Sequence, residues 1–212
     1  MYRIILASES PRRKEILKQM NIPYEVMSSN AQEEVEYTTP SETVEALATL
    51  KAKDVSSRIS REGESSIIIG ADTMVFHKGE ALGKPKDKED AVQMLKSLSG
   101  DVHEVYTGVC IIIRRNNSDS CKDSDETITF SVCTRVEVQQ LTIEQIEDYV
   151  DTGEPLDKAG SYAIQGEFGI YIKEIHGDYY NIVGFPISKI HERLLAHGIN
   201  IKKINRGCII FN

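Results

Sequence analysis

Strand and helix signals alternate along this chain of 212 residues, and the alternation constrains its fold more than any other feature. An apolar run over residues 2–7 predicts a buried strand, and Ser10 followed by Pro11 is typical of a helix N-cap and first helical position. Two long apolar stretches, 104–113 and 128–138, predict paired strands, which argues against a purely parallel sheet. The expected fold class is therefore α/β, with a mixed sheet and flanking helices.

The remaining elements follow from capping residues and apolar periodicity. Helix starts are predicted after residues that cap a helix, or at a proline: Thr39, Asp87, Thr142 and Pro186. Further strands are predicted over residues 23–28, 67–76, 168–175 and 179–185. The polar stretch 114–126 is typical of a flexible hairpin tip, and no repeat or linker divides the chain.

The charge balance limits the classes of ligand. Lys and Arg total 25 against 33 Asp and Glu, a net charge of −8, which argues against nonspecific binding of nucleic acid. A polyanionic ligand would need a local cluster of cations. The longest apolar runs are far short of the ~20 residues that span a bilayer, and the first residues lack a signal-peptide pattern, so no membrane partner is expected. Cys110 and Cys133 lie in apolar runs and are expected to be reduced packing thiols in a cytoplasmic protein.

The first strand-to-helix turn carries cations where a helix disfavours them. Arg12 and Arg13 fall in the first turn of the predicted helix, where the dipole favours anions, and Ser8 precedes them. The first 30 residues hold five Lys or Arg and three Glu inside an acidic chain. An anion docking on this turn, most plausibly a polyphosphate, would explain both facts; the alternative is two solvated arginines on a surface helix.

A lysine completes the apolar stripe of the second predicted helix. The stripe is formed by Val44, Leu47, Ala48 and Val55, and the position that continues it is Lys51. This side chain either snorkels to the surface or points into a cleft.

An aspartate lies in the clearest buried strand. Asp72 follows a run of three isoleucines, and burial of an unpaired carboxylate would be costly. It should therefore have a partner: a metal ion, a lysine or a catalytic water, with a structural salt bridge as the alternative. Lys84, held between Gly83 and Pro85, suits a phosphate contact, although an isolated lysine of this kind is more often a surface residue.

Several common catalytic motifs are absent from the sequence. Nothing matches a Walker loop, a GxSxG elbow, a zinc-spaced Cys/His set or a GxGxxG fingerprint. The five histidines are scattered, so a Ser or Cys hydrolase has little support. Residues 153–166 contain three glycines and a proline, which indicates tight turns whose geometry matters.

Taken in order, the motifs resemble those of the Maf family of nucleoside triphosphate pyrophosphatases, over nearly the whole chain. Each motif is weak alone, but their order and spacing are specific. They are Leu6-Ala7-Ser8 with Ser10-Pro11-Arg12-Arg13, Gly70-Ala71-Asp72-Thr73, Lys84-Pro85, Ser99-Gly100 with His103, Glu154-Pro155, Asp157-Lys158-Ala159-Gly160, Ile164-Gln165-Gly166, and Gly177-Asp178-Tyr179-Tyr180.

The resemblance implies an activity and an architecture. The activity is hydrolysis of a nucleoside triphosphate to the monophosphate and pyrophosphate, and the Asp72-Thr73 pair resembles the branch that acts on dTTP and UTP. Alternatives are a 7-methyl-GTP pyrophosphatase and a nucleotide-binding regulator of septum formation. The implied fold is similar to the inosine triphosphate pyrophosphatases, with two lobes around a cleft in one domain over residues 1–198, followed by a tail, 199–212, with no assigned role. A homodimer would fit the family.

The resemblance also implies roles for single residues. Asp72 would be the proton acceptor, a metal ligand or both, and a divalent cation, Mg²⁺ or Mn²⁺, would assist. Glu33 best matches an acidic residue near the metal, with its neighbour Glu34 as the alternative. Base specificity would depend on Arg12, Thr73 and Gln165, and phosphates would be held by Ser8, Arg13, Lys51 and Lys84.

Overall fold

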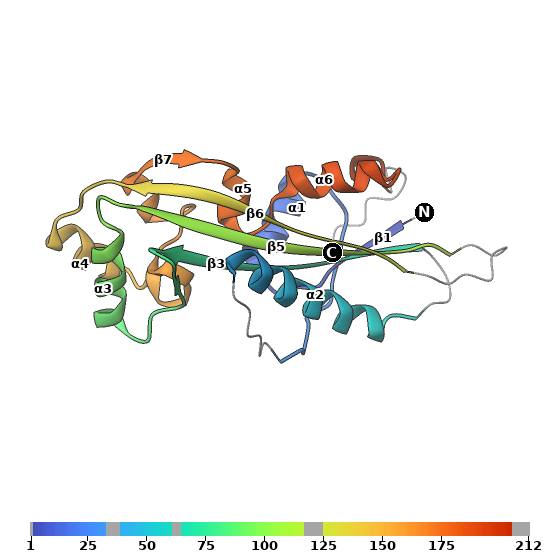
Figure 1. The fold of residues 1–212 in the computed structure, drawn as a ribbon, viewed down its shortest axis with the longest axis horizontal. Helices are drawn as coiled ribbons and strands as arrows, with labels where there is room; N and C mark the ends of the chain where they lie inside the picture. The colour runs from blue at the N-terminus through green and yellow to red at the C-terminus, as the bar shows by residue number, and fades with distance from the viewer. Residues whose placement is uncertain (1, 33–38, 61–64, 117–124, 205–212) are drawn as a thin grey trace. The chain divides into compact units, whose positions relative to one another are not determined.

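The computed structural model describes residues 2–32, 39–60, 65–116 and 125–204. Its sheet has the strand order β2-β1-β3-β5-β6-β7, with β4 paired to β3. Figure 1 labels β1, β3, β5, β6 and β7 of this sheet. The chain divides into two compact units, and three long strands contribute residues to both: β3 (Ser65–His77), β5 (Val102–Arg114) and β6 (Glu126–Val138). Unit 1 comprises residues 1–72, 108–131 and 184–212, and unit 2 comprises residues 73–107 and 132–183.

Unit 1 is built on parallel strands. Strand β1 pairs in parallel with both β2 and β3. Its other elements are β1 (Tyr2–Leu6), α1 (Pro11–Gln19), β2 (Glu25–Val26), α2 (Pro40–Arg58), α6 (Ile187–Ala196) and the 3-10 helix η4 (Ile201–Lys203). The predicted stripe of α2 is buried, and its Ala48 and Val55 pack with residues of β1, β3 and β5 in one apolar cluster.

Two glycines let α2 lie directly on the sheet of unit 1. A Cβ on Gly70 of β3 would lie 2.3 Å from the carbonyl oxygen of Ala48, and one on Gly108 of β5 would lie 2.1 Å from that of Val44. No real side chain tolerates such distances, so glycine is required at both places. The close approach holds the helix that carries Lys51 against the strand that carries Asp72.

Unit 2 mixes helices, 3-10 turns and antiparallel strands. Strand β4 pairs antiparallel with β3, and β7 pairs antiparallel with β6, so the sheet is mixed as predicted. Its other elements are β4 (Glu80–Leu82), α3 (Lys88–Leu98), α4 (Ile143–Asp151), η1 (Glu154–Asp157), η2 (Ala159–Ser161), η3 (Glu167–Tyr171), β7 (Ile172–His176) and α5 (Tyr179–Val183). Its largest apolar cluster joins α3 and α4 around Phe168 and Tyr162.

Most predicted helix starts are confirmed. Asp87 caps α3 by accepting from the N–H of Asp90, and Thr142 with Gln145 forms a complete capping box on α4. Thr39 Oγ1 accepts a hydrogen bond from the backbone N–H of Glu42, and the Thr39 hydroxyl donates to the Glu42 carboxylate.

Predictions on local structure are wrong at three places, the first being residues 168–171, which belong to the 3-10 helix η3 rather than to a strand. Residues 179–185 do not form a strand: the N–H of Tyr180 donates to Asp178 Oδ1 at 2.8 Å and starts the short helix α5, which overrides the strand propensity of its residues. Ser10 occupies the N-cap of α1 with Pro11 at the first helical position, as predicted, although the Ser10 side chain makes no cap hydrogen bond. Cys133 is an exposed free thiol, whereas Cys110 is buried as expected.

The predicted tail begins as part of unit 1. Ile199 and Ile201 are buried, and the Lys202 amine donates to the carbonyl oxygen of Met20. Residues 205–212 lie outside the described residues, and the domain boundary at residue 198 stays a prediction. In the described part of the chain, no helix combines the length and apolar character that crossing a bilayer requires.

Candidate active site

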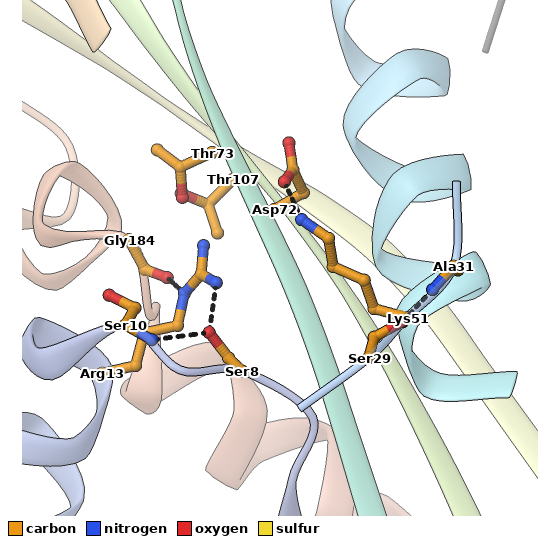
Figure 2. Close-up of polar contacts among 10 residues, drawn as sticks. All are labelled: Ser8, Ser10, Arg13, Ser29, Ala31, Lys51, Asp72, Thr73, Thr107 and Gly184. Carbon is orange, nitrogen blue, oxygen red and sulfur yellow. Dashed lines mark hydrogen bonds and ion pairs between the residues drawn. The ribbon is translucent and has the colours of Figure 1, made fainter. Parts of the chain in front are cut away.

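The turn between β1 and α1 is organised by a buried arginine of unit 1. The Arg13 Nε donates to the carbonyl oxygen of Gly184 at 2.8 Å, and its Nη1 donates to Ser8 Oγ at the same distance (Figure 2). Both Ser8 and Arg13 are 8% exposed. The structure therefore brings together two of the predicted phosphate-binding residues.

The hydrogen bonds at Ser8 define what its hydroxyl can do. Ser8 Oγ accepts from Arg13 and, at 3.3 Å, from the backbone N–H of Ser10. A hydroxyl has two acceptor lone pairs and one hydrogen, so these contacts leave the hydrogen of Ser8 as its donor. A donor beside a guanidinium at a helix N-terminus suits a phosphate oxygen.

The two neighbouring arginines differ in their surroundings. Arg13 is buried and hydrogen-bonded, whereas Arg12 is partly exposed. In the described part of the chain, no hydrogen bond or ion pair joins Arg12 to another residue. Arg13 therefore shapes the turn, and Arg12 is the arginine whose side chain can meet a ligand without breaking a structural contact.

Asp72 has a lysine partner. Lys51 Nζ donates to Asp72 Oδ1 at 2.5 Å, and the two side chains are only 15% and 13% exposed (Figure 2). The expectation that this carboxylate needs a partner is thus met, and the Lys51 amine points toward β3. The pair leaves the second carboxylate oxygen, Oδ2, for another ligand.

Parallel pairing brings these two pairs to neighbouring strands of unit 1. Leu6 of β1 lies opposite Ile69 of β3, and the N–H of Ala7 donates to the carbonyl oxygen of Ile69 at 2.8 Å. The chain then runs on to Ser8 on one strand and to Asp72 on the other, in the same direction. Ser8 follows the carboxyl end of β1 at Leu6, whereas Asp72 lies within β3, which continues to His77. The carboxyl ends of strands are where open α/β sheets bind ligands.

The segment that leads toward Glu33 is anchored on α2. The N–H of Asn30 donates to Asp54 Oδ2 at 2.9 Å and holds the pKa of that carboxyl below its usual value, and Arg58 donates to the carbonyl oxygen of Ser28. Glu33 and Glu34 themselves lie outside the described residues. The choice between them as metal ligand stays a prediction.

In unit 2, Lys84 lies on an exposed turn that is tied to the glycine-rich segment. The N–H of Gly160 donates to the carbonyl oxygen of Gly83 at 3.0 Å. Gly160 has a φ of +70°, a conformation that favours glycine. Two of the motifs that carry the resemblance, at 84–85 and 157–160, are therefore joined by this bond.

Gln165 lies on an exposed turn that Glu154 holds in place. Glu154 Oε2 accepts from the N–H of Glu167 at 3.2 Å, and Oε1 accepts from the hydroxyl of Tyr149 at 2.7 Å. A Cβ on Gly166 would lie 2.1 Å from Glu154 Oε2, so a larger residue there would displace the Glu154 carboxylate from this position. Burial raises the pKa of Tyr149, which keeps it a donor to Glu154.

Glu154 and Thr107 position site residues although no role was predicted for either; the hydroxyl of Thr107 lies 2.9 Å from that of Thr73. Glu154 could have been found from the sequence, because it belongs to the Glu154-Pro155 motif that carries the resemblance. No sequence signal marked Thr107, because its partner lies 34 residues away along the chain.

Possible metal ligands occur at two places. A divalent cation of the kind implied by the resemblance fits the free Oδ2 of Asp72, a hard oxygen ligand. Elsewhere among the described residues, ligand atoms of Glu137, Glu174 and His176 lie within 4.8 Å of one another. Lys173 donates to Glu137 at 2.7 Å, and exposed acidic groups of this kind are common without an ion, so this cluster is not assigned as a metal site.

The family model described as "Maf-like protein" matches residues 3–197. The chain belongs to the Maf family. A dTTP/UTP pyrophosphatase of Alkaliphilus metalliredigens is 48% identical to this Maf protein over 198 residues, 93% of this chain and 97% of the relative. A dTTP/UTP pyrophosphatase of Lachnoclostridium phytofermentans is 44% identical over 203 residues, 96% and 99%.

A solved structure shows weaker likeness. The nucleoside-triphosphatase, a dITP/XTP pyrophosphatase, of Mycobacterium abscessus matches with a TM-score of 0.37 and 15% identity, over 66% of this chain and 76% of that chain. Likeness at this level carries no argument about this Maf protein.

Proposed function

We propose that this Maf protein hydrolyses dTTP and UTP, and modified pyrimidine nucleoside triphosphates, to the monophosphate and pyrophosphate. The observation that carries the proposal is the largely buried Lys51–Asp72 pair, at 2.5 Å. It joins α2 to β3, and β3 is the neighbour of the strand that leads to Ser8 and Arg13. The near-full-length relatives named dTTP/UTP pyrophosphatases support it.

The reaction needs cations around the non-bridging phosphate oxygens and a base that orients the attacking water. In our proposal the Ser8 hydroxyl, the guanidinium of Arg13 and the amine of Lys51 hold the phosphates, and Lys84 of unit 2 adds a further cation. Asp72 accepts the proton of the water through the oxygen that does not bond Lys51. Arg12, Thr73 and Gln165 recognise the base.

A divalent cation, Mg²⁺ or Mn²⁺, would be held by Asp72 and Glu33, and it would neutralise negative charge on the phosphate oxygens. The residues themselves keep separate tasks. Lys51 fixes the orientation of the Asp72 carboxylate through its bond to Oδ1, and Arg13 fixes the orientation of the Ser8 hydroxyl. We expect the enzyme to act in the cytoplasm, and a homodimer fits the proposal.

The test is a nucleotide panel assayed for pyrophosphate release with Mg²⁺ or Mn²⁺. The proposal expects dTTP and UTP to be the preferred substrates, with the monophosphate as the second product. Preference for 7-methyl-GTP would overturn the assignment of the base. Tight binding of UTP without any turnover would overturn the enzyme and favour a nucleotide-binding regulator.

A further inference from the structure

Three polar groups of unit 2 form a chain of hydrogen bonds that ends at Thr73. The hydroxyl oxygens of Thr73 and Thr107 are 2.9 Å apart, and Thr107 Oγ1 lies 2.9 Å from the carbonyl oxygen of Asn181. Thr107 and Asn181 are fully buried, at 0% exposed, while Thr73 is partly exposed. Thr107 can therefore influence a ligand only through Thr73.

The direction of these hydrogen bonds follows from chemistry. A carbonyl oxygen only accepts, so the one hydrogen of Thr107 is donated to Asn181. The contact between the two hydroxyls then needs its hydrogen from Thr73. With its hydrogen given to Thr107, the Thr73 oxygen meets any further polar partner as an acceptor.

The carbonyl group of Asn181 is held in place by its own side chain and by the start of α5. The Asn181 amide donates to the carbonyl oxygen of Val105 at 2.9 Å and to Thr134 Oγ1 at 3.0 Å. Its backbone N–H donates to the carbonyl oxygen of Asp178 at 3.1 Å. Three hydrogen bonds thus anchor Asn181, whose carbonyl oxygen sets the direction of the hydrogen bonds from Thr73 to Thr107 to Asn181.

We infer that Thr107 is a positioning residue that makes the Thr73 hydroxyl a fixed acceptor, and that this acceptor selects bases with a ring N–H donor. The inference rests on the proposed function, in which Thr73 faces the base. Uracil and thymine present one donor on their pairing edge, N3–H, which a fixed acceptor takes. Cytosine presents a bare acceptor at N3, and two facing acceptors leave a desolvated polar group unpaired.

The inference also supplies what Gln165 lacks. An amide can flip, so Gln165 alone presents either a donor or an acceptor and cannot reject cytosine. Thr73 cannot reverse while Thr107 takes its hydrogen. Gln165 is then left to donate to O4, and the threonine decides between uracil and cytosine.

The test compares the ratio of kcat/KM for UTP to that for CTP in three proteins. Thr107→Val keeps the shape but removes the acceptor of the Thr73 hydrogen, so Thr73 becomes free to donate to N3 of cytosine. We expect the ratio to fall by about tenfold or more. Thr107→Ser keeps the hydroxyl and should retain the wild-type ratio. A merely structural role would lower both rates together, and an unchanged ratio in folded Thr107→Val would overturn the inference.

A control variant and a second measurement accompany this test. Thr43→Val removes a threonine hydroxyl from α2 of unit 1, where it donates to the carbonyl oxygen of Thr39, and should leave the ratio unchanged. If Thr107→Val does not fold, wild type is assayed with 3-methyl-UTP, which lacks the N3–H donor, and with 5-methyl-UTP, which carries a methyl group but keeps N3–H. A kcat/KM for 3-methyl-UTP about tenfold or more below that for 5-methyl-UTP supports N3–H as the donor to Thr73.

Equal kcat/KM for 3-methyl-UTP and 5-methyl-UTP would overturn the inference, because the enzyme would then not need the N3–H donor. The failure of the proposed function looks different. In that case wild type releases no pyrophosphate from any pyrimidine nucleotide, whereas failure of the inference leaves UTP turnover intact and only the base preference unexplained.

Discussion

The two units bury different kinds of polar group. Unit 1 buries Arg13 and Arg114, and holds the Lys51–Asp72 pair nearly out of solvent. The buried polar residues of unit 2 are uncharged hydroxyls and amides, together with two histidines, and its described residues include no buried Lys, Arg, Asp or Glu. One unit offers charge, and the other offers neutral groups whose hydrogen bonds have a fixed direction.

Under the proposed function, the phosphates and the base of the substrate need different kinds of group. Charge attracts phosphates strongly but does not distinguish one base from another. Neutral donors and acceptors attract weakly but discriminate well, because a mismatched partner leaves a buried group unpaired. We therefore expect substitution of Asp72 to change the rate for every nucleotide, and substitution of Thr107 or Gln165 to change which nucleotide is preferred.

The largest effect is expected at Asp72. Asp72→Asn keeps the shape but removes the proton acceptor, so kcat should fall by about 10²–10⁴-fold for UTP, dTTP and CTP alike. Steady-state pyrophosphate release measures it. Asp151→Asn, which alters an exposed pair with Lys88, is the control and should keep full activity. Near-normal kcat in folded Asp72→Asn would contradict the role of Asp72 as proton acceptor. A fall in kcat confined to one base would contradict the expectation that Asp72 affects every nucleotide.

A pH effect on stability is expected from the neutral interior of unit 2. Burial lowers the pKa of His103 to about 4, with a smaller contribution from His77 and an opposing one from Asp101, and its Nε2 meets the hydroxyl of Tyr162 at 2.7 Å. Below its usual pKa of 6.5 the unfolded chain binds this proton before the folded one. The unfolding free energy should therefore fall as the pH drops from 6.5 to 4, by about 3 kcal/mol from this group.

Denaturant unfolding between pH 7 and pH 4 measures this effect against His103→Gln. The amide can still meet Tyr162 but cannot titrate, so the variant should lose less stability over this interval than wild type. Equal losses in the two proteins would show that His103 is protonated in the folded state or that other groups dominate.

The adjacent arginines should separate stability from binding. Arg13→Ala removes two buried hydrogen bonds and leaves the carbonyl oxygen of Gly184 without its donor, which should cost about 2 kcal/mol of unfolding free energy. Arg12→Ala should leave stability within about 0.5 kcal/mol and raise KM. Both predictions are tested by measuring thermal unfolding and the KM for UTP on the two variants. A large stability loss in Arg12→Ala would show that it is structural.

Features of this structure that depend on residues close together in the sequence were predicted better than features that depend on distant residues. The helix starts at Asp87 and Thr142 are local, and both are confirmed. Lys51 and Asp72 were singled out because each breaks an apolar pattern, although neither pattern names the other as partner. Helix α5 was missed because its residues favour a strand and the cap at Asp178 outweighs that preference.

The roles of Thr107 and Glu154 escape sequence reasoning for a different reason. Each acts through hydrogen bonds to residues distant along the chain, and the direction of a hydroxyl depends on every neighbour at once. A threonine in a strand is unremarkable in sequence, since threonine is common there. Only the carbonyl oxygen of Asn181, 74 residues away, makes this one different.

The smallest effect, and the sharpest on base choice, is expected at Gln165. Gln165→Glu replaces a group that can donate with one that only accepts, which opposes O4 of uracil but suits the N4 amine of cytosine. KM for UTP should rise by about tenfold and the preference for UTP over CTP should shrink, with thermal stability unchanged because the side chain is exposed. Gln93→Glu, on the exposed face of α3, is the matched control for added charge. An equal fall for both nucleotides would mean that repulsion of the triphosphate, rather than recognition of the base, explains the change.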